Sequence, residues 1–411
     1  MLAAHFAFTE VEGVPGSDDS RRPPRVEGLM AASEARAGAG EEAEDEDTGE
    51  EPAFFEDPGQ ILKTLGIVIV LVAAIYIAVP KIAGLEDAIA LIGEASRWWI
   101  GVAVLATVVS FGAYVALFRG VVGHKTVELD WRESYQITMA GLAATRLFSA
   151  GGAGGILLTY WALLKAGMKK AESARRMVAF LVVLYAVYVV AVIVFGVLLR
   201  TGALPGDGPV SVTIIPAAIA AIVGVTVILI AKIPADLQRR LDRRTGDGRF
   251  AAVMTKLAAL PQTVGSGIRT AWEFAAHPRR GWLAILGSVG FWAANIMILW
   301  ASFKSLGVTV PLGEIVVGFF VGMVANLAPA PAGVGAVDGG LIGVFAILGY
   351  PLETVIASVL IYRLLAFYLP VPPGIVAFFQ LRRTVARWEA ERAGTAPGLT
   401  PSERVSTHPT S

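Results

Sequence analysis

The sequence has no cysteine and only four histidines, His5, His124, His277 and His408. Without cysteine the chain forms no disulfide, no thiolate metal site and no cysteine nucleophile. The histidines lie outside the apolar runs and make no His-Glu-x-x-His pattern, which argues against metal-assisted hydrolysis. A Gly-x-Ser-x-Gly elbow, a Walker loop and a dinucleotide fingerprint are also missing. We therefore predict no catalytic residue, no metal site and no cofactor, and we expect a protein that is not an enzyme.

Charge is scarce as well. Charged residues fill 17% of the 411 positions, whereas ordinary soluble domains carry about 25%. Hydrophobic residues make up 55% of the chain and the mean hydropathy is +0.64. Several windows are nearly continuous apolar runs of the ~20 residues that a membrane helix needs. These properties predict an all-α, polytopic integral membrane protein.

The charges that do occur are segregated along the chain. Residues 41–57 hold ten acids and no base, whereas residues 232–280 hold ten Lys or Arg against four acids. A polar segment with too little apolar surface to bury stays unfolded. Residues 1–60 are therefore expected to be a disordered acidic tail without a signal peptide, whether the protein starts at Met1 or Met30. The basic loop is expected to face the membrane surface rather than nucleic acid.

Six apolar runs are long enough to cross the bilayer. They are Ile61–Val79, Trp98–Phe118, Met177–Leu199, Ser211–Ala231, Gly281–Phe303 and Leu352–Phe379. Together they predict a transmembrane domain at residues 61–383. The segment after it, residues 384–411, is expected to form a disordered C-terminal tail.

Two further apolar stretches, about Gln136–Ala166 and Glu314–Leu348, are each interrupted. Both are too long for one upright crossing and too short for two. Glycine lets the backbone turn, proline breaks the helical ladder, and the freed backbone groups must face protein or water. Such paired breaks point to the substrate site of a transporter. The residues that make them are Gly151, Gly152, Gly154 and Gly155 in the first stretch, and Pro329, Pro331, Gly333 and Gly335 in the second.

The order of the elements repeats along the chain. Two spans, a broken hairpin and a third span occur in residues 61–199 and again in residues 211–379. Three crossings in each half would invert the second half relative to the first. The placement of Lys and Arg predicts that both termini and the loop 232–280 are cytoplasmic. The first hairpin should then enter from the cytoplasm and the second from outside. In the alternative, both broken stretches are kinked helices and the chain has eight full spans.

Three charged residues lie well inside the predicted membrane segments, away from the ends of those segments. Arg146 stands at the head of the first break, where its planar guanidinium suits a phosphate, although it can also snorkel to the interface. Asp338 follows the second break and is placed to pair with Arg363, midway along the last span. That pair is either structural or part of the site. If Asp338 is instead unpaired, it is placed to bind a cationic headgroup or a proton. Four polar residues are expected either to line the same cavity or to make ordinary inter-helix hydrogen bonds: Asn295, Asn326, Tyr362 and Tyr368.

The second break resembles the flippase-like transmembrane domain of lysylphosphatidylglycerol synthases and their standalone relatives. The resemblance lies in Pro331-Ala-Gly-Val-Gly-Ala-Val-Asp338, followed by Gly349, Arg363 and Pro370. It extends more diffusely over residues 61–383, and it implies movement of a phospholipid or a related lipid between leaflets. Relatives often carry a Gly-Glu-x-x-Arg-like pair in the first break, where this chain has Gly155 and apolar residues. The resemblance implies no lysyl transfer, because it covers no aminoacyl-transferase domain.

The expected function is a translocase of the bacterial cytoplasmic membrane that moves a phospholipid or a lipid-linked envelope precursor. Its expected partners are membrane lipids and proteins of envelope synthesis, and not nucleic acid. No ATPase motif is present, so transport should be passive, ion-coupled or dependent on a partner. Two alternatives stay open: a membrane-embedded transferase on a lipid-linked substrate with Asp338 as base, and a non-transporting scaffold of an envelope-synthesis complex.

Overall fold

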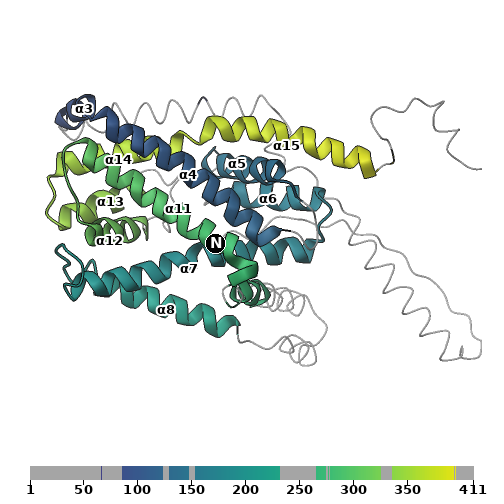
Figure 1. The fold of residues 1–411 in the computed structure, drawn as a ribbon, viewed down its shortest axis with the longest axis horizontal. Coiled ribbons are helices and arrows are strands. Elements are labelled where there is room, and N and C mark those ends of the chain that lie inside the picture. Colours follow the sequence, from purple (N-terminus) through teal and green to yellow (C-terminus); the bar gives the residue numbers. More distant parts are fainter. Residues whose placement is uncertain are drawn as a thin grey trace, which may run out of the picture. The chain divides into compact units, whose positions relative to one another are not determined.

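The computed structural model describes residues 66, 86–123, 129–147, 153–231, 265–274, 276, 278–324, 336–392 and 394. All regular structure in these parts of the chain is helical, in agreement with the predicted all-α class (Figure 1). The predicted first span, the acidic tail and most of the basic loop 232–280 lie outside the described residues. A short helix, α3 (Glu86–Gly93), precedes the bundle and packs against the last span.

Four helical segments are long and apolar enough to cross a membrane. They are α4 (Arg97–Val122), α7 (Lys170–Arg200), α11 (Pro278–Ser305) and the composite of α14 (Leu352–Arg363), a π-helical turn η4 (Leu364–Tyr368) and α15 (Val371–Arg392). A shorter apolar helix, α8 (Ile214–Ala231), packs beside α7. The chain is therefore a multi-pass membrane protein.

The predicted start of the disordered C-terminal tail is wrong. Helix α15 continues through residue 384 to Arg392 because its end packs on the first hairpin. Lys165 forms an ion pair with Glu389 at 2.8 Å, and Trp388 Nε1 donates to Glu133 Oε1 at 3.3 Å. These contacts supply the partners that the polar sequence alone does not reveal.

Both interrupted stretches form pairs of short antiparallel helices. The first pair is α5 (Trp131–Leu147) with α6 (Ala153–Lys165), and the second is α12 (Leu312–Met323) with α13 (Ala336–Ile347). In the second pair, Gly318 faces Phe345 and Gly322 faces Leu341, so the two helices run in opposite directions. At 1.5 Å per residue, helices as short as α6, α12 and α13 are about 20 Å long or less, short of the ~30 Å hydrocarbon core. These are the predicted hairpins rather than two kinked full spans.

The contacts between helices repeat with the two halves exchanged. In each half the two arms of the hairpin pack on one another. The first arm of each hairpin also packs on the last span of the other half, α5 on α15 and α12 on α7. Helices α4 and α11, which hold equivalent places in the two halves, form the closest pair in the bundle. This exchange of partners is what an inverted repeat produces.

Small residues bring α4 and α11 together. A Cβ built on Gly287 would lie 2.7 Å from the backbone O of Ala113, and one built on Gly120 would overlap Ala284. Close backbone approach through small residues is the usual basis of helix association in lipid. Asn295 Nδ2 also donates to Ser110 Oγ at 2.9 Å between the two helices. These contacts hold α4 and α11 together at several points along their length.

The two hairpins open at opposite ends of the bundle (Figure 1). The α5/α6 hairpin starts close to the C-terminal end of α4, where Arg119 donates to the backbone O of Leu129. The α12/α13 hairpin starts just after the C-terminal end of α11. That end lies at the N-terminal end of α4, because Ser96 N donates to the Ser305 backbone O at 2.8 Å. Each hairpin therefore reaches inward from its own end of the bundle.

Replacing Gly155 with Val should destabilise the first hairpin. A Cβ at this position would overlap Thr145 Oγ1 and the Gly141 backbone O, so α6 must move away from α5. Overpacking of this kind costs about 1–3 kcal/mol, which should appear as a lower melting temperature of the protein in detergent. Gly112→Val is the matched control, because nothing lies within 4 Å of a Cβ at Gly112. Equal melting temperatures for the two variants would contradict this packing.

Candidate functional site

The inner ends of both hairpins meet the last span at its π-helical turn. From the first hairpin, Arg146 Nη1 donates to the Phe367 backbone O at 2.5 Å. From the second, Asp338 Oδ1 lies 2.7 Å from Nε of Arg363, the residue just before the π-helical turn. Both arginines lie over the Phe367 ring, whose centroid is 4.8 Å from Cζ of Arg146 and 4.5 Å from Cζ of Arg363. We call Arg146, Asp338, Arg363 and Phe367 the mid-span cluster.

The π-helical turn follows from three nearby prolines. Pro370, Pro372 and Pro373 have no N–H, so the carbonyls four residues before them lose their helical donors. The backbone relaxes into a wider turn in which Leu369 N bonds to the Leu364 backbone O at 3.0 Å. Backbone acceptors at this depth need partners from the protein. The carbonyl of Phe367, which belongs to this turn, accepts from Arg146.

The charged residues of the cluster differ in how deeply they are buried and in whether an opposite charge lies beside them. The Arg363 side chain is 6% exposed and that of Asp338 is 21% exposed. Arg363 Nη2 also donates to Asp338 Oδ2 at 3.3 Å, so the pair has two contacts. Asp338 lies in the first turn of α13, where a carboxylate is favourable near the helix N-terminus. By contrast, the first turn of α6 has no acidic residue.

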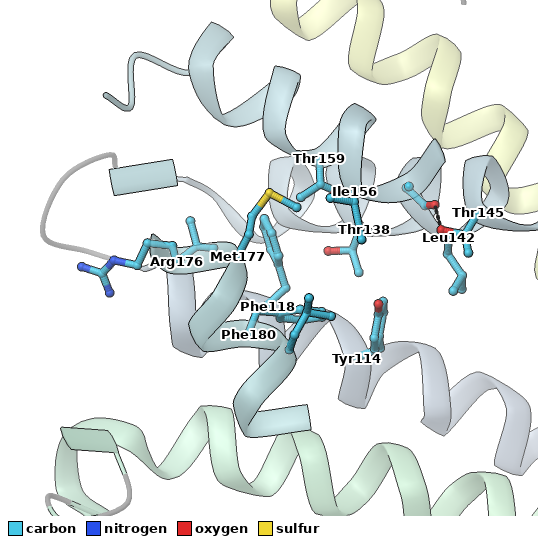
Figure 2. Close-up of a pocket in the computed structure, with 14 residues that line it drawn as sticks. Tyr114, Phe118, Thr138, Leu142, Thr145, Ile156, Thr159, Arg176, Met177 and Phe180 are labelled. Atoms are coloured by element: carbon cyan, nitrogen blue, oxygen red, sulfur yellow. Dashed lines mark hydrogen bonds between the residues drawn. The ribbon is translucent and has the colours of Figure 1, made fainter. Parts of the chain in front are cut away.

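A cleft lies between the first hairpin and the spans α4 and α7 (Figure 2). The spans α4 and α7 contribute Phe118, Met177 and Phe180, and most of the hydroxyl groups come from threonines of the hairpin. Its volume of about 70 Å³ has room for a few water molecules. In Figure 2 Arg176 lies at one end of the cleft, with Tyr114 and Thr145 toward the other. The residues with hydroxyl groups are Tyr114, Thr138, Thr145 and Thr159.

Not all predicted site residues are found together. Gly154 and Gly155 form the start of α6, and Gly155 lines the cleft. Tyr362 hydroxyl lies 3.5 Å from Asn295 Oδ1, between helices and outside the cleft lining. Tyr368 belongs to the π-helical turn and is not part of the cleft lining either. The remaining predicted residues lie outside the described part of the chain: Gly151, Gly152, Asn326, Pro329, Pro331, Gly333 and Gly335.

Sequence reasoning missed the threonines of the cleft and the role of Phe367. A signal for the threonines was present, because Thr138 and Thr145 are seven residues apart and so share one face of α5. Within the described residues, no group of three His, Asp or Glu side chains comes together as a metal ion would need.

A second polar cluster lies at the far end of the bundle. Glu314 is 6% exposed and accepts from the Asp207 backbone N at 2.7 Å and from the Tyr350 hydroxyl at 2.5 Å. Burial, and then the hydrogen bond to Glu314, raise the pKa of Tyr350. This cluster joins the α7–α8 loop to the α12/α13 hairpin. It closes that end of the bundle, and we assign it a structural role.

Comparison with known proteins gives two matches. The family model described as the lysylphosphatidylglycerol synthase TM region matches residues 64–374 of the 411. A UPF0104 membrane protein of Methanothermobacter thermautotrophicus is 28% identical over 138 residues. That alignment covers 33% of this chain and 38% of the relative, so the chain spans well under two thirds of the relative's length. The family match includes both hairpins and the whole mid-span cluster.

The Asp338–Arg363 pair should show strong energetic coupling. Asp338→Ala leaves a buried arginine without its carboxylate, which typically costs about 3–5 kcal/mol. The double variant Asp338→Ala with Arg363→Met removes both charges. It should therefore lose less stability than the two single changes, Asp338→Ala and Arg363→Met, added together. Unfolding titrations with SDS in mixed micelles give the four free energies of unfolding. Simple additivity would contradict the pairing.

Proposed function

Because the chain belongs to the lysylphosphatidylglycerol synthase TM family, we propose that it moves a phospholipid or a lipid-linked envelope precursor between the leaflets of the cell membrane. One observation carries this proposal: two hairpins reach part-way in from opposite ends of the bundle and meet at the mid-span cluster. The headgroup would pass along the polar side of the cleft while the acyl chains stay in the bilayer.

The cost of moving a charged headgroup through hydrocarbon explains why polar groups lie at mid-depth. A charged group placed in hydrocarbon costs several kcal/mol, so a translocase needs polar groups at mid-depth to replace water of hydration. Arg146 and the Asp338–Arg363 pair supply charges, and Thr138 and Thr145 supply hydroxyl groups along the way. Interrupted helices allow this, because their ends bring polar groups to a depth where continuous helices have none exposed.

The distribution of basic residues supports an orientation for the bundle. The end where the α5/α6 hairpin opens carries most of the described Lys and Arg, whereas the opposite end carries Arg97, Arg200 and Lys304. Since cytoplasmic flanks are enriched in Lys and Arg, we place the first of these ends in the cytoplasm, together with the C-terminus. Its basic residues are Arg119, Arg132, Lys165, Lys169, Lys170, Arg175, Arg176, Arg382, Arg383, Arg387 and Arg392.

The two hairpins are packed differently in this conformation. The cleft lies beside the α5/α6 hairpin. The equivalent space beside the α12/α13 hairpin is filled by Phe303, Phe319 and Phe345, which are fully buried. In our proposal this is the state in which the cluster is reached from the cytoplasmic side. Exchange of packing between the two hairpins would open the other side, as expected for inverted repeats.

Removing the charge of Arg146 should slow lipid movement. Hydrogen bonds to charged groups contribute about 1.5–3 kcal/mol, so Arg146→Gln should lower the rate roughly 10- to 100-fold. Arg383→Gln, a change at an exposed arginine of the basic end, is the matched control and should retain the wild-type rate. The rate is measured in vesicles that contain the purified protein and a fluorescent phospholipid, with dithionite quenching the dye in the outer leaflet.

Two outcomes count against the proposal. Wild-type vesicles that quench no faster than protein-free vesicles would refute lipid movement by the protein alone. If the wild-type chain moves lipid and Arg146→Gln does so equally well, the mid-span cluster is not the path. A cell that needs the protein but tolerates Arg146→Gln would then favour the scaffold role.

A further inference from the structure

The charged residues of the mid-span cluster do not balance. Among the described residues the cluster contains two arginines, Arg146 and Arg363, and one carboxylate, Asp338. The connecting segments 148–152 and 325–335 contain no ionisable residue in their sequence, so they add no charge at this depth. Two arginines against one aspartate leave one positive charge at the centre of the membrane.

The imbalance resides on Arg146. Asp338 makes two contacts with Arg363, at 2.7 Å and 3.3 Å. Within the described part of the chain, Arg146 contacts neutral groups, the Phe367 carbonyl and the face of its ring. A cation–π contact contributes about 2 kcal/mol when desolvated. That is small beside the cost of an uncompensated charge in hydrocarbon, so an anion that joins Arg146 would lower the free energy of the site.

The chemistry of Arg146 suits a phosphate. A guanidinium offers parallel N–H groups that match two phosphate oxygens. Both guanidinium groups lie over the Phe367 ring. Thr145, the residue before Arg146 in α5, lines the end of the cleft opposite Arg176 (Figure 2) and carries a hydroxyl group.

The cleft indicates the source of the phosphate. Phe118, Met177 and Phe180 on α4 and α7 suit contact with an acyl chain, and the threonine hydroxyls of the hairpin suit a glycerol phosphate. A free inorganic phosphate has no apolar group that could contact the apolar residues of the cleft. A zwitterionic headgroup carries its own cation and has a net charge of zero. It would therefore not compensate the positive charge of Arg146.

We propose that the mid-span cluster selects lipids whose headgroup has a net negative charge, and that Arg146 binds the lipid phosphate while the Asp338–Arg363 pair positions Phe367. This inference rests on the proposed function, because it names the class of lipid that is moved. In this proposal the excess positive charge of the mid-span cluster serves to recognise the lipid.

Binding is tested on the purified full-length protein in an uncharged detergent. The melting temperature is followed while phosphatidylglycerol, phosphatidylcholine, diacylglycerol or inorganic phosphate is added. We expect phosphatidylglycerol to stabilise the protein at concentrations at least tenfold lower than phosphatidylcholine, and diacylglycerol to have no effect. Arg146→Gln should weaken the response to phosphatidylglycerol at least tenfold. Arg146→Lys should retain part of it, because lysine keeps the charge but loses the planar fork.

Several results would overturn the inference. They are equal responses to phosphatidylglycerol and phosphatidylcholine, an unchanged response in Arg146→Gln, or stabilisation by inorganic phosphate as strong as by the lipid, which would mean a free-phosphate site. Arg383→Gln controls for attraction of anionic lipid to the basic end and should respond as the wild type does. If Arg146→Gln does not fold, the comparison of the four ligands on the wild type, together with Arg146→Lys, still decides.

The test separates this inference from the proposed function because it measures binding without transport. Selective binding of phosphatidylglycerol in a protein that moves no lipid in vesicles would refute the translocase and keep the anion site. Movement of phosphatidylcholine and phosphatidylglycerol at equal rates, unaffected by Arg146→Gln, would keep the translocase and refute the anion site.

Discussion

Backbone groups in the hydrocarbon core must find partners inside the protein, and this constraint governs the arrangement described above. Helices α5, α6, α12 and α13 all begin or end part-way through the bundle, and the last span contains a π-helical turn beside three prolines. Helix ends of this kind are stable within the membrane only where other helices surround them and shield their backbone groups from lipid. The α4–α11 pair and the outer spans provide that surrounding, and Arg146 provides a donor for the Phe367 carbonyl. Polar groups thereby reach a depth at which a bundle of continuous helices would have none to offer a lipid headgroup.

The inverted repeat gives this arrangement two related sides. Each hairpin is held by the last span of the other half, so a shift of one half changes the surroundings of both hairpins. The two halves nevertheless differ in the sequences of their hairpins. The first hairpin has threonines beside a cleft, whereas the second has fully buried phenylalanines and an aspartate that pairs with Arg363. The repeat sets the geometry, and these differences in side chains set the charge; under our proposal they also set the side from which the cluster is reached.

Sequence patterns predicted the main architecture because membrane helices follow simple rules of length and polarity. The two breaks were visible as glycine and proline clusters, and the positions of Asp338 and Arg363 were enough to propose their pairing. The cleft could not be predicted, because it depends on how α4 and α7 pack around the hairpin. The helical end of α15 was missed for a related reason: Trp388 and Glu389 look like residues of a polar tail until Glu133 and Lys165 are brought beside them. Phe367 is one of many apolar residues in its span, and only the three-dimensional contacts single it out.

The most direct test is the side from which the two hairpins enter, and the absence of cysteine makes it simple. Single cysteines at Trp131 and Lys165 mark the open end of the first hairpin, and single cysteines at Leu312 and Ile347 mark that of the second. Intact cells and inside-out vesicles are labelled with a thiol reagent that does not cross membranes. We predict that the first two positions react only from the cytoplasm and the last two only from outside. If the two positions of one hairpin react from different faces, that stretch crosses the membrane completely and the account is wrong.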